Sequence, residues 1–141
     1  KGITIMPMTK GDTIEMGNTA LVTVLSTDSD STVLQANYID SVFLFMSDAS
    51  YDTEVKLTEM YDVKSDVLLV SHNGNKDASY NDFIREVAPD YAVISPGTEI
   101  YSEEAKKTLE ENTDYILTSN EYGRIVISSD GYQLNFSSDK E

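Results

Sequence analysis

The sequence predicts an α+β or α/β fold, in which an antiparallel β-meander leads into alternating strands and helices of one mixed sheet. Up to Met46 short apolar runs are separated by polar turns, without the spacing of an amphipathic helix. Beyond that residue, short apolar runs alternate with helical patterns. The expected order, β-β-β-β-β-α-β-α-β-α-β-β-β, places the helices on one face of the sheet. Its other face then needs a partner layer, or a second half that this chain lacks.

The first half reads as five strands, expected over residues 3–8, 13–16, 20–25, 32–38 and 41–46. A turn at residues 10–12 is indicated by Gly11-Asp12, and the polar stretch 26–31 is expected to be a loop. Ile39-Asp40 separates the last two runs and is expected to form a hairpin turn, although it lacks the usual glycine.

The second half begins with a helix that Ser50 or Asp52 could cap and that extends to residue 61, with Val55, Leu57 and Met60 as its apolar stripe. Further strands are expected over 67–70, 91–95 and 115–118, and further helices over 80–87 and 102–111. A hairpin over 124–127 and 132–136 follows from Asp130-Gly131, the strongest turn signal in the chain.

Two helix ends carry specific signals. Ser79 with Asp82 three residues later forms an approximate capping box for the helix over 80–87, whose inward face would carry Phe83, Ile84 and Val87. Acidic residues open the helix over 102–111 and lysines follow, as the helix dipole favours.

Composition limits the classes of function. The chain has 141 residues, which suits one domain over 1–141, and no repeat or domain boundary is found. It has no cysteine, so disulfides and thiolate metal sites are excluded. The net charge of −15 argues against direct binding of nucleic acid, because that affinity comes largely from Lys and Arg.

The chain is also expected to be exported and not to enter a membrane. No apolar run approaches the roughly 20 residues that span a bilayer. A composition rich in Ser, Thr, Asn and Asp with few lysines resembles exported bacterial surface proteins, so an extracellular or cell-surface location is expected. Because the chain begins with Lys1, we expect a cleaved product or a piece of a longer protein.

The order of motifs resembles the C-terminal half of a metallo-β-lactamase-fold domain, of the type that ends ComEC-like DNA-uptake (competence) proteins. The motifs are a Gly-Asp turn, a strand ending in a Gly-Asp pair, a strand ending in His-His-Gly, and a Pro-x-x-Ala-Val-Ile-Ser strand. They correspond here to residues 10–12, 43–48, 65–74 and 89–95, so the resemblance spans nearly the whole chain.

The resemblance implies metal-assisted hydrolysis, often of phosphodiesters, by two zinc or manganese ions that activate a water. From this half the family uses an aspartate and a histidine, and Asp48 and His72 match those positions. Ser47, Asn73 and Gly74 flank them as supporting residues, with Ser47 in place of the family's glycine and Asn73 in place of its second histidine. A later family histidine is replaced near residues 101–102. The His-x-His-x-Asp-His motif of the other half is absent, since His72 is the only histidine.

Asp48 and His72 both follow buried strands, so they could meet at one edge of the sheet. They are two ligands, whereas catalytic zinc takes about three protein ligands and a water. We therefore expect a relict site without a bound cofactor, in which Asp48 caps the following helix and His72 satisfies local backbone groups. Zinc or manganese would bind only if another half completed the site.

Other candidate sites have weaker support. Residues 26–30 are rich in oxygen ligands but lack the glycine and glutamate of a calcium loop, so a solvated turn is expected. Ser71 and Ser95 lack the second histidine and the Gly-x-Ser-x-Gly turn that would support a nucleophile. The nine tyrosines are spread along the chain, and those in or beside strands are expected on the core or the sheet faces.

Two functions follow from these expectations. The first is a degenerate, non-catalytic metallo-β-lactamase-like domain of a secreted or surface bacterial protein, with a structural or interaction role; its partner would be the missing N-terminal half or another protein domain. The alternative is the C-terminal half of a metal-dependent hydrolase or nuclease whose other half is absent. A separate and weaker hypothesis is a binding module whose exposed sheet face docks a partner, which an apolar patch on the face without helices would favour.

Overall fold

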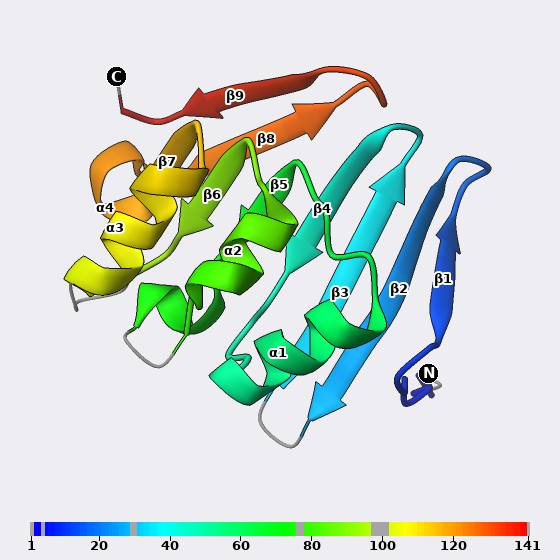
Figure 1. Ribbon diagram of the computed structural model, residues 1–141. Coiled ribbons are helices and arrows are strands. Elements are labelled where there is room, and N and C mark those ends of the chain that lie inside the picture. The colour runs from blue at the N-terminus through cyan, green and yellow to red at the C-terminus, as the bar shows by residue number, and fades with distance from the viewer. Residues whose placement is uncertain (1, 4, 29–30, 76–77, 97–101, 141) are drawn as a thin grey trace.

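The fold is a seven-stranded mixed sheet with three helices on one face and a separate β-hairpin. The computed structural model describes residues 2–3, 5–28, 31–75, 78–96 and 102–140. The strands of the large sheet lie side by side in the order in which they occur in the chain (Figure 1). They are β1 (Thr13–Met16), β2 (Ala20–Asp28), β3 (Ser31–Tyr38), β4 (Ser41–Phe45), β5 (Val67–Leu69), β6 (Tyr91–Ile94) and β7 (Tyr115–Thr118). This confirms the mixed sheet with helices on one face.

The strands β1 to β4 form the antiparallel meander that the sequence predicts. Residues 39 and 40 make the tight turn between β3 and β4, and Ile39 takes the left-handed backbone (φ 56°) that glycine usually supplies there. The loop expected over 26–31 is shorter, because β2 continues to Asp28 and β3 begins at Ser31. The strand expected over 3–8 is wrong for the described residues of that stretch: no strand is assigned there, and Ile3 and Ile5 are 88% and 86% exposed.

The parallel half of the sheet has a regular internal period. In β5, β6 and β7 the paired residues Val67, Tyr91 and Tyr115 each lie 24 positions after the one before, and Phe43 of β4 precedes Val67 by the same interval. Residues at equal offsets therefore align across the sheet at both ends of these strands. The sequence analysis finds no repeat, and the constant length of each strand–helix unit is a structural period with little repeated sequence.

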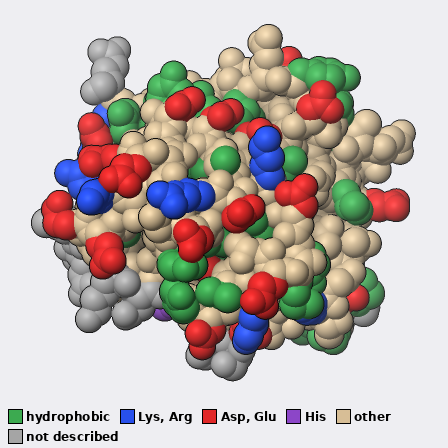
Figure 2. All heavy atoms as spheres, in the orientation of Figure 1, with side chains coloured by type: hydrophobic (Ala, Val, Ile, Leu, Met, Phe, Trp, Pro, Cys, Tyr) green, Lys and Arg blue, Asp and Glu red, His purple; other side chains and the backbone are tan. Residues whose placement is uncertain are grey.

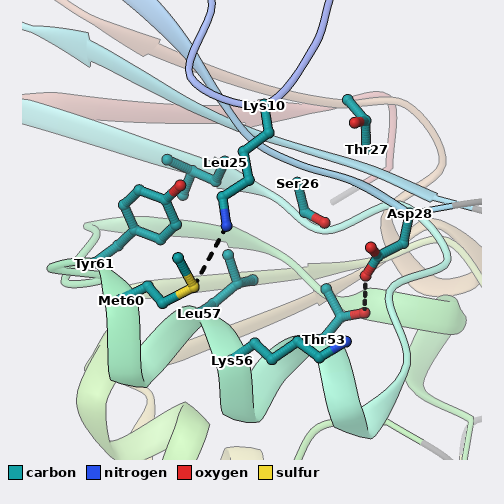
Figure 3. A pocket seen from close by; sticks show the side chains of 10 residues that line it. All are labelled: Lys10, Leu25, Ser26, Thr27, Asp28, Thr53, Lys56, Leu57, Met60 and Tyr61. Carbon is teal, nitrogen blue, oxygen red and sulfur yellow. Dashed lines mark hydrogen bonds between the residues drawn. The ribbon is translucent and has the colours of Figure 1, made fainter.

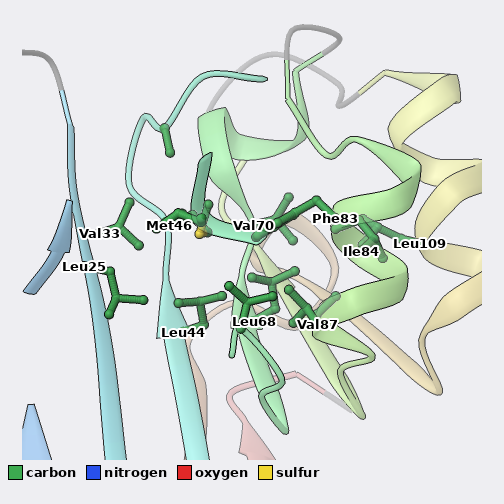
Figure 4. Close-up of a cluster of buried hydrophobic side chains, with 14 of the residues drawn as sticks. Leu25, Val33, Leu44, Met46, Leu68, Val70, Phe83, Ile84, Val87 and Leu109 are labelled. Carbon is green, nitrogen blue, oxygen red and sulfur yellow. The ribbon is translucent and has the colours of Figure 1, made fainter. Parts of the chain in front are cut away.

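Three helices cover one face of the sheet: α1 (Tyr51–Met60), α2 (Asn81–Val87) and α3 (Glu103–Asn112) (Figure 1). Their apolar side chains pack on alternate residues of the strands, including Leu44 and Leu68, which are fully buried (Figure 4). Phe83, Ile84 and Val87 of α2 enter this core as expected. The outer surface of the helices carries interspersed acidic and basic side chains (Figure 2).

The helix ends partly differ from expectation. Ser50 is the N-cap of α1, without a side-chain bond to the backbone, and Ser102 caps α3 by accepting the Ala105 N–H at 3.1 Å. Asp48 does not cap α1. The capping box of α2 is wrong too: Tyr80 is its N-cap, while Ser79 has a positive φ of 64°. The apolar stripe of α1 is displaced, since Thr53, Glu54 and Leu57 are its buried residues and Met60 is 56% exposed.

A hairpin of β8 (Ile125–Ser129) and β9 (Leu134–Ser138) forms its own two-stranded sheet instead of extending the large one. It follows a short helix, α4 (Ser119–Tyr122), that the sequence analysis did not anticipate. Its turn is fastened to the β3–β4 turn: the Asp40 N–H donates to the Gly131 carbonyl at 2.9 Å, and the hydroxyls of Ser41 and Ser129 lie 2.6 Å apart. A Cβ on Gly131 (φ 101°) would lie 2.5 Å from Cδ1 of Ile39, so this close contact requires glycine.

Within the described part of the chain, no helix has the length and apolar character needed to cross a membrane.

Candidate functional site

The loops that follow β4 and β5 meet at the carboxyl end of the parallel strands. The N–H of His72 donates to the carbonyl of Ser47 at 3.0 Å, which places the backbone of His72 beside the residue that precedes Asp48. The N–H of Ser102 donates to the carbonyl of Gly74 at 2.9 Å and brings the start of α3 to the same loop. The structure thus brings together the segments of the three positions that the resemblance selected.

The backbone around these residues is held in an uncommon conformation. Ser47, His72 and Asn73 have φ angles of 50°, 45° and 52°, in the left-handed region that residues with a side chain seldom occupy. His72 and Asn73 interrupt the 3₁₀ turn over Ser71–Gly74, which the N–H of Asn75 closes by donating to the His72 carbonyl at 2.9 Å. Such strain persists only where the surrounding structure fixes it.

A buried carboxylate on α1 supplies that fixation. Glu54 is fully buried and accepts three hydrogen bonds from the segment after β5. The hydroxyl of Ser71 and the N–H of Ser79 donate to Oε1, and the N–H of Tyr80 donates to Oε2 at 2.9 Å. These bonds tie both ends of the loop that carries His72 to α1. They also explain why Ser79 does not cap α2, since its backbone is turned toward Glu54.

The electrostatics of Glu54 reflect this burial. Desolvation raises the pKa of Glu54 above its usual value, while the hydrogen bonds from Ser71, Tyr80 and Ser79 and the nearby charge of His72 act in the opposite direction. The sequence analysis missed Glu54 because an acidic residue in a helix is normally a surface residue. The available signal was its position three residues before Leu57, which places both side chains on one face of α1.

The predicted metal site has two candidate ligands in this structure. Asp48 is exposed and His72 is half-buried at the joined loops. Among the described residues no group of three or more His, Cys, Asp or Glu side chains is arranged to hold a metal ion. Asp48 and His72 thus stay a prediction as ligands. Of the supporting positions, Ser47 and Gly74 accept backbone hydrogen bonds through their carbonyls, from the N–H groups of His72 and Ser102.

A serine follows the carboxyl end of each of the four parallel strands. Ser47, Ser71, Ser95 and Ser119 follow β4, β5, β6 and β7 at equal offsets, so the 24-residue period aligns them at one edge of the sheet. The hydroxyl of Ser71 is bound to Glu54, and that of Ser95 lies 3.4 Å from that of Ser119. None of these bonds joins a serine to an imidazole, so the structure adds no support for a nucleophile.

A small hollow lies between α1 and β2, lined by residues that include Lys10, Asp28, Thr53 and Tyr61 (Figure 3). Asp28 belongs to the oxygen-rich stretch, of which residues 29 and 30 lie outside the described part of the chain; its carboxylate accepts from the Thr53 hydroxyl at 2.9 Å. The side chain of Lys10 also has partners within the chain, since its Nζ lies 3.4 Å from the Met60 sulfur and 5.4 Å from the Tyr61 ring centre. The volume of about 100 Å³ is below that of ordinary ligand pockets.

The comparisons with known proteins support the fold. No protein-family model and no curated protein matches the chain. Among solved structures, the chain is similar to the metallo-β-lactamase fold protein YhfI from Bacillus subtilis, with a TM-score of 0.56 and 14% sequence identity. The match covers 84% of this chain and 52% of that protein, so the chain spans about half the length of its structural neighbour. At this identity the likeness establishes a metallo-β-lactamase-like architecture and leaves activity open.

Proposed function

We propose that this chain is a non-catalytic domain of metallo-β-lactamase-like fold that acts by binding a protein β-layer on the sheet face opposite its helices. We name this surface the helix-free face. It consists of the strand residues that alternate with the buried core residues Leu44, Leu68 and Ala92, namely Phe43, Phe45, Val67, Leu69, Val93, Tyr91 and Tyr115.

The apolar character of the helix-free face is the observation that carries the proposal. Phe45 and Tyr115 are 39% and 55% exposed, and the outer strand β1 adds Ile14 and Met16 at 45% and 59%. Ile125 and Ile127 of β8 cover part of the face and leave an apolar groove of about 240 Å³ between the hairpin and the sheet. Exposed apolar surface of this kind is typical of an interaction site.

A β-layer is the occupant that suits this surface. Sheets pack face to face through alternating apolar side chains, and a sheet with helices on one face gains a stable core by covering the other. The hairpin β8–β9 already lies against the face as a two-stranded layer (Figure 1), and its outer edges pair with no other strand of the described residues. From the composition alone, we further propose that the chain belongs to a secreted or surface-anchored bacterial protein.

The test compares apolar exposure on the two faces of the sheet. Phe45→Ser and Tyr115→Ser should each lower the fluorescence of the neutral dye Nile red bound to the folded protein by at least about half, because they remove exposed rings from the helix-free face. Met60→Ser removes an equally exposed side chain from α1 and serves as the control. Equal signals from all three variants would contradict the proposal.

A second candidate function is the C-terminal half of a ComEC-like metal-dependent hydrolase or nuclease. The hydrogen bonds from His72 to Ser47 and from Ser102 to Gly74 favour it, because they join the segments where that family places its ligands. Zinc or manganese ions held with the help of a complementary half would supply an activated water. Hydrolysis of bis(p-nitrophenyl) phosphate that requires both Asp48 and His72 would establish this function instead of the first.

A further inference from the structure

The helix-free face is bordered by a row of aspartates at the amino ends of the parallel strands. Asp66, Asp90 and Asp114 directly precede β5, β6 and β7, and we call them the aspartate row. The 24-residue period aligns them, since the N–H of Tyr91 donates to the Asp66 carbonyl at 3.0 Å and that of Tyr115 to the Asp90 carbonyl at 2.9 Å.

The aspartate row adjoins an aromatic part of the helix-free face. The rings of Tyr91 and Tyr115 stack with centres 5.0 Å apart and an interplanar angle of 17°. Asp66, Asp90 and Tyr91 line a polar cavity of about 340 Å³ beneath the hairpin turn, together with Asp40 and Tyr132. Carboxylates and tyrosine side chains therefore line the same cavity, and both groups attract cations.

These charges are not neutralised within the described part of the chain. The ion pairs found there join Arg85 to Asp82, Arg124 to Asp139 and two lysines of α3 to its glutamates, and none of them involves the aspartate row. Lys64 acts favourably on Asp90, against the repulsion from Asp66 and Asp114. Burial, followed by these two neighbouring charges, raises the pKa of Asp90. The row thus carries a repulsion that a cationic partner would relieve.

We propose that the β-layer that docks on the helix-free face is basic along the edge that meets the aspartate row, where its Lys or Arg side chains lie over Tyr91 and Tyr115 and pair with the carboxylates. This inference rests on the proposed function and specifies its partner. Apolar side chains of the partner fill the groove beside β8, and its basic edge fixes the direction and register of docking. A second copy of this chain is a poorer partner than a basic β-layer, because each copy carries −15 and offers no complementary net charge.

The probe is a synthetic disulfide-closed β-hairpin with alternating Val and Thr, made with four Lys or with four Glu at one end. Binding is measured by fluorescence anisotropy with the full chain. The Lys hairpin should bind about tenfold more tightly than the Glu hairpin, the size expected from two or three exposed ion pairs. Substitution Asp66→Asn/Asp90→Asn/Asp114→Asn should remove this preference.

Two further variants of the chain control for net charge and for folding. Glu103→Gln/Glu104→Gln/Glu110→Gln removes the same number of charges from α3 and should keep the preference. Because the Asp66 carboxylate accepts the Val42 N–H at 2.7 Å, the double variant Asp90→Asn/Asp114→Asn, which retains this bond, should remove most of the preference with the fold intact.

The outcomes separate this inference from the proposed function. If both hairpins bind equally and Phe45→Ser abolishes binding, the apolar surface is confirmed and the basic edge is wrong. If the α3 variant loses the preference as fully as the row variant, only net charge is at work and the inference is also wrong. If neither hairpin binds, at any salt concentration, both the inference and the proposed function are overturned.

Discussion

Polar side chains have opposite environments at the two ends of the parallel strands. At the carboxyl end, Glu54 is buried and accepts hydrogen bonds from Ser71, Ser79 and Tyr80, so that the His72 loop is fixed. At the amino end, Asp66, Asp90 and Asp114 gather like charges at the border of an exposed aromatic surface. The same 24-residue period aligns the serines that follow the parallel strands and the aspartates that precede them. Under the proposed function, the end where this fold class usually keeps its chemistry serves as a structural fastening, and the opposite end borders the surface on which a partner docks.

The largest expected effect comes from breaking the fastening at the carboxyl end. In Glu54→Gln the amide group places N–H donors opposite the N–H of Tyr80 or the donors of Ser71 and Ser79, so at least one buried donor loses its acceptor. The free energy of unfolding should fall by about 2 to 3 kcal/mol. Urea unfolding measures this, with Glu59→Gln on the exposed side of α1 as the control. Equal stability of the two variants would show that the three bonds contribute nothing.

A smaller effect is expected where the hairpin turn is fastened at the amino end. Gly131→Ala should lower the free energy of unfolding by about 1 to 2 kcal/mol, because a positive φ and the contact with Ile39 both oppose a side chain. Gly11→Ala is a matched control, since Gly11 has a similar φ of 91° but a Cβ added there would meet no atom within 4 Å. The difference between the two variants measures the contact alone. If Gly11→Ala cost as much, the turn would not be held by close packing.

The smallest expected effect is a gain in stability when one charge of the aspartate row is removed. Since the folded-state pKa of Asp90 is raised above 3.8, its contribution to stability is present below pH 3.8 and is lost as the pH rises through the folded pKa. Asp90→Asn avoids this loss and should be more stable than the parent at pH 7, by less than about 1 kcal/mol.

Urea unfolding of the parent and of Asp90→Asn between pH 3 and pH 7 (roughly the range over which carboxylates titrate) measures this difference, with Glu86→Gln on α2 as the control. The parent should lose stability relative to Asp90→Asn as the pH rises. A difference that stays constant with pH would show that the row stores no repulsion.

The sequence analysis predicted the fold well because most strands are short apolar runs bounded by turn residues. Hydrophobic periodicity located β2 to β7 and the hairpin around Asp130-Gly131. It failed at residues 3–8, where apolar residues lie exposed without a partner strand among those described, since a pattern of apolar residues indicates what can be buried and not what covers it.

The candidate site was less accessible to sequence reasoning. The resemblance selected Asp48 and His72, and the structure joins their loops through the backbone. Glu54 was missed because its role depends on donors 17 to 26 residues away, which meet it only in the folded chain. The aligned serines at the carboxyl ends and the aspartate row at the amino ends were missed, because their alignment depends on the pairing register of the parallel strands. The sequence pattern of each separate strand does not contain that register.

The claim that the carboxyl end no longer serves metal chemistry is tested most directly by a calorimetric zinc titration of the chain, beside His72→Ala and Asp48→Ala. Catalytic zinc takes about three protein ligands and a water, and the described residues gather no such set. The account predicts no stoichiometric site of sub-micromolar affinity, and the same weak heat from all three proteins. One zinc per chain bound at sub-micromolar affinity, and lost in both variants, would contradict it and show that the metal site survives.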